Sequence, residues 1–245
     1  MLIENKFIYI SLPRCASTSF MASCVKQNLD IKHHNDNYNI NNQLIHTQYD
    51  NINQIHFQDF EIEFVHVHES ISLLKEKFGY YYDVISVRRN KYERFISLWK
   101  HILKMFYRYN NLDTFNKLSN LTIDEVLLYK TNDLQSVESV EEVVEIFIKN
   151  YKLNLTETGR TMLRILIFPY SKWHNHDPDI IWFDFNELYK LEEWVSNKLN
   201  MNFKLMNLNT SQHFDSKLEL NDEFKEKYDS IYLPYDGVKN VKTLF

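Results

Sequence analysis

The sequence contains few of the residues that define several common small architectures. Only two cysteines occur among 245 residues, which excludes a disulfide framework and a cysteine-rich zinc module. Three glycines and four prolines exclude collagen-like repeats and a linker-rich chain. No run of 18 or more apolar residues occurs, so we predict no transmembrane helix. The first residues lack the basic stretch and the apolar core of a signal peptide, so we expect a cytoplasmic protein.

The chain nevertheless has ample material for a large core. Hydrophobic residues make up 44% and aromatic residues 15% of the sequence, which excludes wholesale disorder. A net charge of -5 argues against a nucleic-acid coat and against a polybasic membrane binder. We therefore expect no nucleic-acid partner and no membrane insertion, while a local basic pocket for a small anion is compatible with this charge.

Strand and helix patterns alternate along the chain. Short apolar runs bounded by polar residues predict strands at residues 7–12, 63–68, 81–88 and 179–184. Amphipathic segments predict helices at residues 17–27, 70–78, 91–106, 139–151, 187–199 and 221–231. Residues 122–125 form a capping box that opens one more helix, and residues 33–43 have the composition of a surface loop. The alternation predicts a single P-loop-like α/β domain over residues 1–245, with a central parallel sheet and helices on both faces.

Hydroxyl-bearing residues and one arginine follow the first predicted strand. Arg14 lies in the turn, and Ser17, Thr18 and Ser19 are candidate caps of the next helix. The N–H groups at a helix N-terminus suit a phosphate or a sulfate. The Walker pattern is absent and the loop has no glycine, so an ordinary P-loop NTPase is disfavoured. Taken alone, the segment fits a plain capped helix equally well.

A second cationic segment follows the third predicted strand. Arg89 stands at the end of that strand and Ser97 lies eight residues later, within the next helix. An arginine fork at a strand end and a hydroxyl on the adjoining helix can converge on one anion. For an isolated arginine, a solvated side chain or a surface ion pair is the better interpretation.

Together, the two segments resemble the cofactor-binding signatures of the sulfotransferases that use 3′-phosphoadenosine 5′-phosphosulfate (PAPS), above all the carbohydrate branch. The first signature is matched by residues 13–20, which read PRCASTSF, and the second by Arg89-Asn90 with Arg94 and Ser97 at the family's spacing. This chain has Arg14 where the family usually has lysine, and Lys91 where it usually has proline. The resemblance implies that Arg89 and Ser97 hold the 3′-phosphate. It also implies that the first loop binds the cofactor through Arg14, Cys15, Ala16, Ser17, Thr18 and Ser19.

The resemblance continues more weakly toward the end of the chain. Residues 181–188 are similar to the family's late strand and the turn that follows it. Residues 206–211 are similar to its asparagine-and-serine cofactor loop, which implies cofactor contacts for Asn209 and Ser211.

The second predicted strand carries the candidate base. His66 and His68 share one face of it, and His68 lies at its carboxyl end, where parallel sheets bind ligands. Neutral imidazole is suited to accepting a proton near pH 7. The heparan 2-O branch of the family has a similar His-x-His that acts in catalysis. This likeness implies His68 first and His66 second, although a packed core histidine is the plainer interpretation of either alone. The neighbouring Glu69 is the reserve candidate for the base. A zinc site shared with His174 and His176 is a minor alternative, and we expect no metal.

These observations predict an enzyme that moves a sulfuryl group from PAPS to an acceptor hydroxyl, on a saccharide or another small molecule. Two alternatives stay open at this point. A P-loop-like kinase or other phosphotransferase would share the strand–loop–helix plan but should need a loop lysine and an acidic magnesium ligand. A non-catalytic nucleotide- or glycan-binding module would keep the anion site and would not depend on His68.

Overall fold

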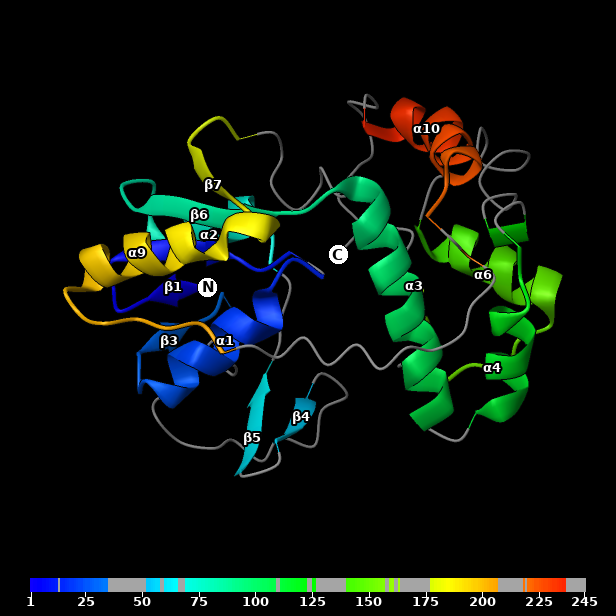
Figure 1. Cartoon of the computed structure of the whole chain (residues 1–245), viewed down its shortest axis with the longest axis horizontal. Coiled ribbons are helices and arrows are strands. Elements are labelled where there is room, and N and C mark those ends of the chain that lie inside the picture. Colours follow the sequence, from blue (N-terminus) through cyan, green and yellow to red (C-terminus); the bar gives the residue numbers. More distant parts are fainter. Residues whose placement is uncertain are drawn as a thin grey trace. The chain divides into compact units, whose positions relative to one another are not determined.

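The computed structural model describes residues 1–12, 14–34, 52–57, 60–65, 69–108, 111–122, 125–126, 140–156, 159–160, 163, 177–206, 218 and 220–236. The chain forms two compact units (Figure 1). Unit 1 comprises Met1–Arg89 and Tyr170–Asn209, and unit 2 comprises Asn90–Pro169 and Thr210–Phe245. The prediction of a single domain over residues 1–245 stays a prediction.

Unit 1 contains a mixed five-stranded sheet of order β3-β1-β2-β6-β7 (Figure 1). Its strands are β1 (Leu2–Ile3), β2 (Phe7–Ile10), β3 (Ile31–Lys32), β6 (Asp83–Arg88) and β7 (Ile180–Asp184). β2, β6 and β7 are parallel, as predicted, whereas β1 is antiparallel to both β2 and β3.

The expectation of a wholly parallel sheet is therefore wrong at the β1 edge, and a tight turn explains why. Glu4 and Asn5 both have positive φ angles, and the Lys6 N–H donates to the Ile3 carbonyl at 2.8 Å. A turn of this kind reverses the chain at once, so β1 and β2 can pair only in antiparallel fashion.

A separate hairpin pairs β4 (Ile52–Phe57) with β5 (Phe60–Val65) in antiparallel fashion. β5 covers the start of the strand predicted at residues 63–68, but it pairs with β4 and not with the five-stranded sheet. The reasoning that put His68 at the carboxyl end of a central strand therefore fails. His66 and His68 themselves lie outside the described residues.

Most predicted helices form close to their expected bounds. Unit 1 contains α1 (Ser17–Lys26), α2 (Ile71–Phe78), the 3₁₀ turn η2 (Phe185–Glu187) and α9 (Leu188–Leu199). Unit 2 contains α3 (Lys91–Arg108), α4 (Leu112–Ser119), α6 (Val140–Tyr151) and α10 (Asp222–Asp236), of which α4 was not predicted. Among the described helices, none is long and apolar enough to cross a membrane.

The capping box is confirmed in both directions. The Thr122 N–H donates to the Glu125 carboxylate at 2.8 Å, and the Glu125 N–H donates to the Thr122 hydroxyl at 3.4 Å. This local pattern needs no tertiary partner, which is why the sequence alone was enough to predict it.

The core of unit 1 is built on both faces of β2. Phe7 and Tyr9 share one face, where Tyr9 stacks on Phe20 of α1 with 3.9 Å between ring centroids. Phe7 meets Trp194 of α9 edge-on at 5.1 Å, so α1 and α9 cover this face. Ile8 and Ile10 point to the other face and are fully buried, which shows that it is covered as well.

Unit 2 packs its helices around the apolar face of α3. Phe95, Trp99 and Leu103 are buried on this helix and belong to one cluster with residues of α6 and α10. Phe224 of α10 lies 5.9 Å from Phe95 between ring centroids. The long amphipathic pattern predicted for this helix is thus used to form a core.

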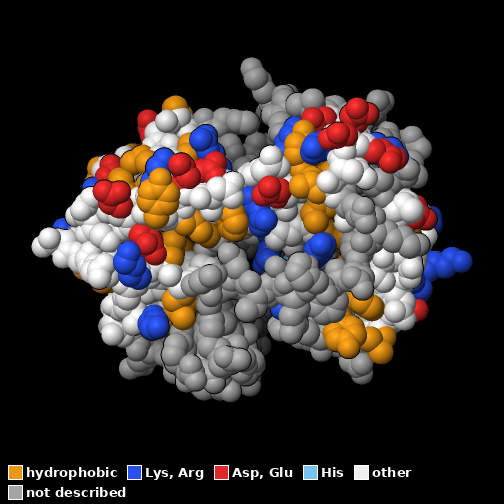
Figure 2. Space-filling view, viewed as in Figure 1, with side chains coloured by type: hydrophobic (Ala, Val, Ile, Leu, Met, Phe, Trp, Pro, Cys, Tyr) orange, Lys and Arg blue, Asp and Glu red, His pale blue; other side chains and the backbone are white. Residues whose placement is uncertain are grey.

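The surface of unit 1 carries mixed charges. Lys190 pairs with Glu187, Lys198 with Asp83, and Lys204 with Glu192. Figure 2 shows acidic and basic side chains close together on the side of unit 1 that is in view. Such pairs are typical of an ordinary solvated surface.

Candidate functional site

The candidate site lies at the carboxyl edge of the five-stranded sheet. β2, β6 and β7 are parallel and adjacent, with Ile10 paired to Ser86 and Arg88 to Asp184. The residues that follow these three strands therefore emerge at one edge, which is where open α/β sheets bind ligands. The Ser86 hydroxyl donates to the Ile10 carbonyl at 2.9 Å and ties β2 to β6 close to this edge.

The loop between β2 and α1 has a backbone conformation that usually calls for glycine. Arg14 has a φ of 63° and Ala16 a φ of 59°. A left-handed conformation costs a residue with a Cβ roughly 1–2 kcal/mol. Strain of this kind is held in place by the surrounding structure and is found most often at functional sites.

The start of α1 differs from the prediction in a way that favours anion binding. The N-cap residue is Ala16, which has no polar side chain, and no side chain caps the helix. The expectation that Ser17, Thr18 or Ser19 caps it is therefore wrong. The first intrahelical bond runs from the Phe20 N–H to the Ala16 carbonyl at 2.9 Å. The N–H groups of the residues before Phe20 therefore take no part in the helical bonding, and such groups are the ones that a helix offers to an anion.

The loop residues that were predicted to bind the cofactor fall into two groups. Cys15, Ser17 and Ser19 are buried, whereas Arg14, Ala16 and Thr18 are half-buried. Among the described loop residues, the second group is therefore the one whose side chains are more exposed to a ligand. The Cys15 side chain is fully buried and forms no disulfide.

Arg14 and Arg89 bring two positive charges to this edge. Burial lowers the pKa of Arg14 below its usual value, and the charge of Arg89 acts in the same direction. Arg89 follows β6, and its guanidinium carbon lies 4.4 Å from the centre of the Phe185 ring. Guanidinium groups keep their proton in proteins, so the edge carries two fixed cations beside the start of α1.

The remainder of the second signature belongs to unit 2. The Asn90 side chain accepts hydrogen bonds from the Tyr92 and Glu93 N–H groups at 3.1 and 3.3 Å, so it caps α3. Lys91, which stands where the family has proline, pairs with Asp229 of α10. Ser97 is half-buried on α3, and its pairing with Arg89 of unit 1 stays a prediction.

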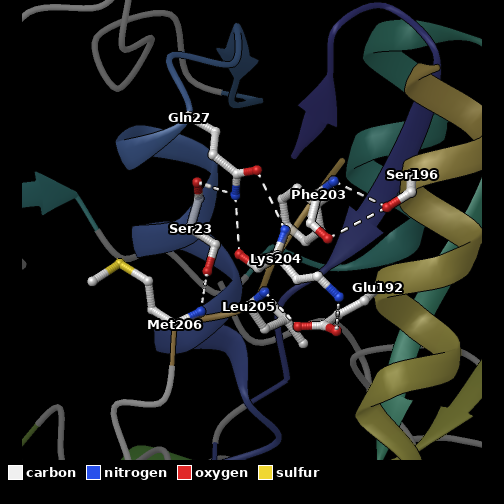
Figure 3. Close-up of polar contacts among 8 residues, drawn as sticks. All are labelled: Ser23, Gln27, Glu192, Ser196, Phe203, Lys204, Leu205 and Met206. Carbon is white, nitrogen blue, oxygen red and sulfur yellow. Dashed lines mark hydrogen bonds and ion pairs between the residues drawn. The ribbon is translucent and has the colours of Figure 1, made fainter. Parts of the chain in front are cut away.

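A short segment after α9 runs along α1 toward the loop (Figure 3). Near the end of α1, the Gln27 amide donates to the Lys204 carbonyl at 3.0 Å. One turn earlier in α1, the Ser23 hydroxyl accepts from the Met206 N–H at 2.7 Å. The described segment thus advances toward the start of α1 as the chain approaches the predicted cofactor loop. Asn209 and Ser211 lie outside the described residues.

The same segment is held on its other side by α9 (Figure 3). The Glu192 carboxylate accepts from the Leu205 N–H at 2.8 Å and pairs with the Lys204 ammonium at 3.2 Å. The Ser196 hydroxyl bonds to both the N–H and the carbonyl of Phe203, at 3.0 and 3.3 Å. Contacts with α1 on one side and α9 on the other fix the direction of the segment. The sequence motif alone did not indicate this direction.

A second charged cluster lies at the end of β3, and it shows that the prediction of a surface loop at residues 33–43 is wrong at His33, while residues 35–43 lie outside the described residues. His33 is fully buried, and its Nδ1 lies 3.2 Å from Oε2 of Glu69. The His34 N–H donates to Oε1 of Glu69 at 2.5 Å, and the Met1 ammonium lies 3.5 Å from Oε2. No local pattern marks His33 as buried, because its partner is 36 residues away.

These contacts give Glu69 a structural role. Burial alone would raise the pKa of Glu69, but the hydrogen bond from His33 and the neighbouring positive charges lower it to about 2. A carboxylate with such a pKa is a weak base at neutral pH, and both of its oxygens are already engaged. The reserve role that the sequence suggested for Glu69 is thus disfavoured. Burial lowers the pKa of His33, although Glu69 opposes this shift.

The zinc alternative stays untested, because His66, His68, His174 and His176 all lie outside the described residues. Among the residues that are described, no group of three His, Cys, Asp or Glu side chains is placed to hold a metal ion. Asp177, which follows the second His-x-His, accepts a hydrogen bond of 2.5 Å from the buried ammonium of Lys75.

Comparisons with known proteins add no assignment. No family model, no curated protein and no solved structure matches this chain. Function is therefore inferred from the residues and geometry of this chain alone.

Proposed function

We propose that this protein is a PAPS-dependent sulfotransferase with a P-loop-like nucleotide site. The observation that carries the proposal is the placement of Arg14 and Arg89 after the adjacent parallel strands β2 and β6, with Arg14 just before α1, a helix that no side chain caps. The two signatures that resemble the family contain these residues. PAPS is an anion with phosphate at both ends of its ribose, and two cations beside a helix N-terminus suit such a ligand.

The proposed roles follow from the positions of the two arginines. Arg14, next to α1, holds the 5′-phosphosulfate, and Arg89, at the end of β6, holds the 3′-phosphate. Arg14 acts as a fixed charge and not as an acid, because a guanidinium keeps its proton at working pH. It stabilises the negative charge that grows on the leaving phosphate in the transition state.

The reaction is an in-line displacement at sulfur. The acceptor oxygen forms a bond to sulfur while the bond between sulfur and the bridging oxygen breaks, and the electron pair leaves with 3′-phosphoadenosine 5′-phosphate (PAP). The acceptor proton passes to a general base, for which we propose His68 first and His66 second. No step requires a metal. We propose a saccharide hydroxyl as the acceptor class, because the carbohydrate branch is the closest in motif.

Two tests separate this proposal from its alternatives. Titration calorimetry with PAP, PAPS and ATP should show strong binding of the first two, whereas preference for ATP would favour a phosphotransferase. A screen of saccharides and small alcohols for PAP release from PAPS should find turnover. Tight PAP binding with no turnover on any acceptor would favour a non-catalytic module.

A single variant tests the role of Arg89. Replacement Arg89→Ala should weaken PAP binding by about 1.5–3 kcal/mol, the usual range for a charged hydrogen bond. Binding of adenosine 5′-phosphosulfate, which lacks the 3′-phosphate, should change little. Equal losses for both nucleotides would show that Arg89 does not recognise the 3′-phosphate.

A further inference from the structure

Phe185 lies against one of the two arginines of the site. Its ring centre is 4.4 Å from the guanidinium carbon of Arg89. The contact follows from the sheet register. Arg88 and Asp184, the last residues of β6 and β7, are paired, so the residues that follow them, Arg89 and Phe185, lie next to each other. The Asp184 carboxylate accepts a hydrogen bond from the Asn186 N–H at 2.9 Å, which shapes the turn that carries Phe185.

The ring compensates for an unfavourable feature of the site. Arg14 and Arg89 follow adjacent parallel strands and both carry positive charge, so they repel each other. Burial is the main cause of the lowered pKa of Arg14, and the charge of Arg89 adds to it. Before an anion binds, this repulsion favours conformations in which the Arg89 side chain turns away. The face of an aromatic ring carries negative charge and attracts a guanidinium, so Phe185 favours the conformation that stays at the edge.

We propose that Phe185 is a positioning residue, which holds Arg89 in the orientation that binds the second phosphate of the nucleotide. The inference rests on the proposed function. It explains why the site should prefer nucleotides that carry a 3′-phosphate over those that lack one. Phe185 acts through Arg89 and does not itself need to touch the ligand. Its contribution is preorganisation, because the arginine no longer has to be ordered when the ligand arrives.

The chain offers a matched control two residues earlier. Phe183 is also an aromatic residue of this segment, but it packs in the core against Trp194, with 6.1 Å between ring centroids. Replacement Phe183→Leu removes a ring of the same size without touching Arg89. It should lower stability and leave nucleotide preference unchanged.

The test is calorimetric titration of PAP and of adenosine 5′-phosphosulfate into six proteins: wild type, the control Phe183→Leu, Phe185→Leu, Phe185→Tyr, Arg89→Ala and the double variant Phe185→Leu/Arg89→Ala. The leucine variant should bind PAP about 3- to 10-fold more weakly, in the range of a partly exposed cation–π contact, and bind the other nucleotide normally. The tyrosine variant should restore PAP binding, because its ring has the same face. In the Arg89→Ala background, loss of the ring should have no further effect.

The outcomes separate the inference from the proposed function. If wild type binds PAP but Phe185→Leu loses the same factor for both nucleotides, or adds its effect to that of Arg89→Ala, the positioning role is overturned while the proposed function stands. If wild type binds neither nucleotide, both are overturned.

Discussion

Two charged clusters lie at the same edge of the five-stranded sheet, and they differ in how their charges are arranged. At the end of β3, the Glu69 carboxylate accepts from His33 and from the His34 N–H, so opposite charges and dipoles meet. At the ends of β2 and β6, Arg14 and Arg89 bring two like charges together.

The arrangement of charges indicates which cluster stabilises the fold and which one suits a ligand. Opposite charges satisfy each other and stabilise the fold when their hydrogen bonds are complete. Like charges repel each other, and an anion that binds between them is attracted by both. We therefore expect substitutions in the arginine cluster to affect ligands and substitutions in the Glu69 cluster to affect stability.

The largest expected effect concerns Arg14. Replacement Arg14→Met should lower the kcat for PAPS turnover by roughly 10²–10³-fold, as expected when one group that stabilises transition-state charge is removed. The conservative Arg14→Lys should keep substantial activity, because it keeps the charge. Steady-state kinetics on both variants checks this, and normal turnover in the Met variant would remove Arg14 from the proposed site.

The next effect concerns the stability of the Glu69 cluster. Replacement Glu69→Gln should lower the free energy of unfolding by about 3 kcal/mol, because it leaves His33 and its neighbours without a buried negative charge. Urea unfolding measures the loss. Asp113→Asn, which breaks an exposed pair with Lys117, is the control and should cost almost nothing. A strong loss of PAP affinity in Glu69→Gln, with little loss of stability, would break the comparison.

Acid should act on the same cluster. The pKa of Glu69 is lowered from 4.5 to about 2, so its contribution is complete above pH 4.5 and is lost as the pH falls toward 2. The pKa of His33 is also lowered, so below pH 6.5 the unfolded chain takes up a proton that the buried ring resists. Both effects make wild type less stable in acid. The difference in unfolding free energy between wild type and Glu69→Gln should shrink below pH 4.5, and a constant difference would contradict this account.

The smallest effect is expected from a substitution that adds a negative charge beside the two arginines, so that opposite charges meet there as they do around Glu69. Replacement Ala16→Asp places a carboxylate at the start of α1 and should raise stability by about 0.3–1 kcal/mol, as acidic groups do at helix N-termini. It should also weaken PAP binding, because the carboxylate competes for the same cations. Ala16→Asn, with the same shape but no charge, is the control. Unchanged PAP affinity in the Asp variant would place the nucleotide elsewhere.

Much of the fold could be predicted because it depends on local patterns. α1, α2, α3 and α9 follow apolar periodicity, and the capping box of Thr122 and Glu125 uses residues three positions apart. β2, β6 and β7 are short apolar runs, which is why they were found, and helices lie between them along the chain, as is typical of parallel strands. The strand ends that carry Arg14 and Arg89 followed from the same reasoning.

Tertiary structure decided what depends on distant partners. His33 is buried because Glu69, far along the chain, receives its hydrogen bond, and nothing near His33 indicates this. Phe185 meets Arg89 because of the register between two strands that are almost a hundred residues apart, which no local pattern encodes. The sequence by itself determined which residues stand at the strand ends. Only packing and strand order determined which of their charges meet, because electrostatic interactions depend on distances through space and not along the chain.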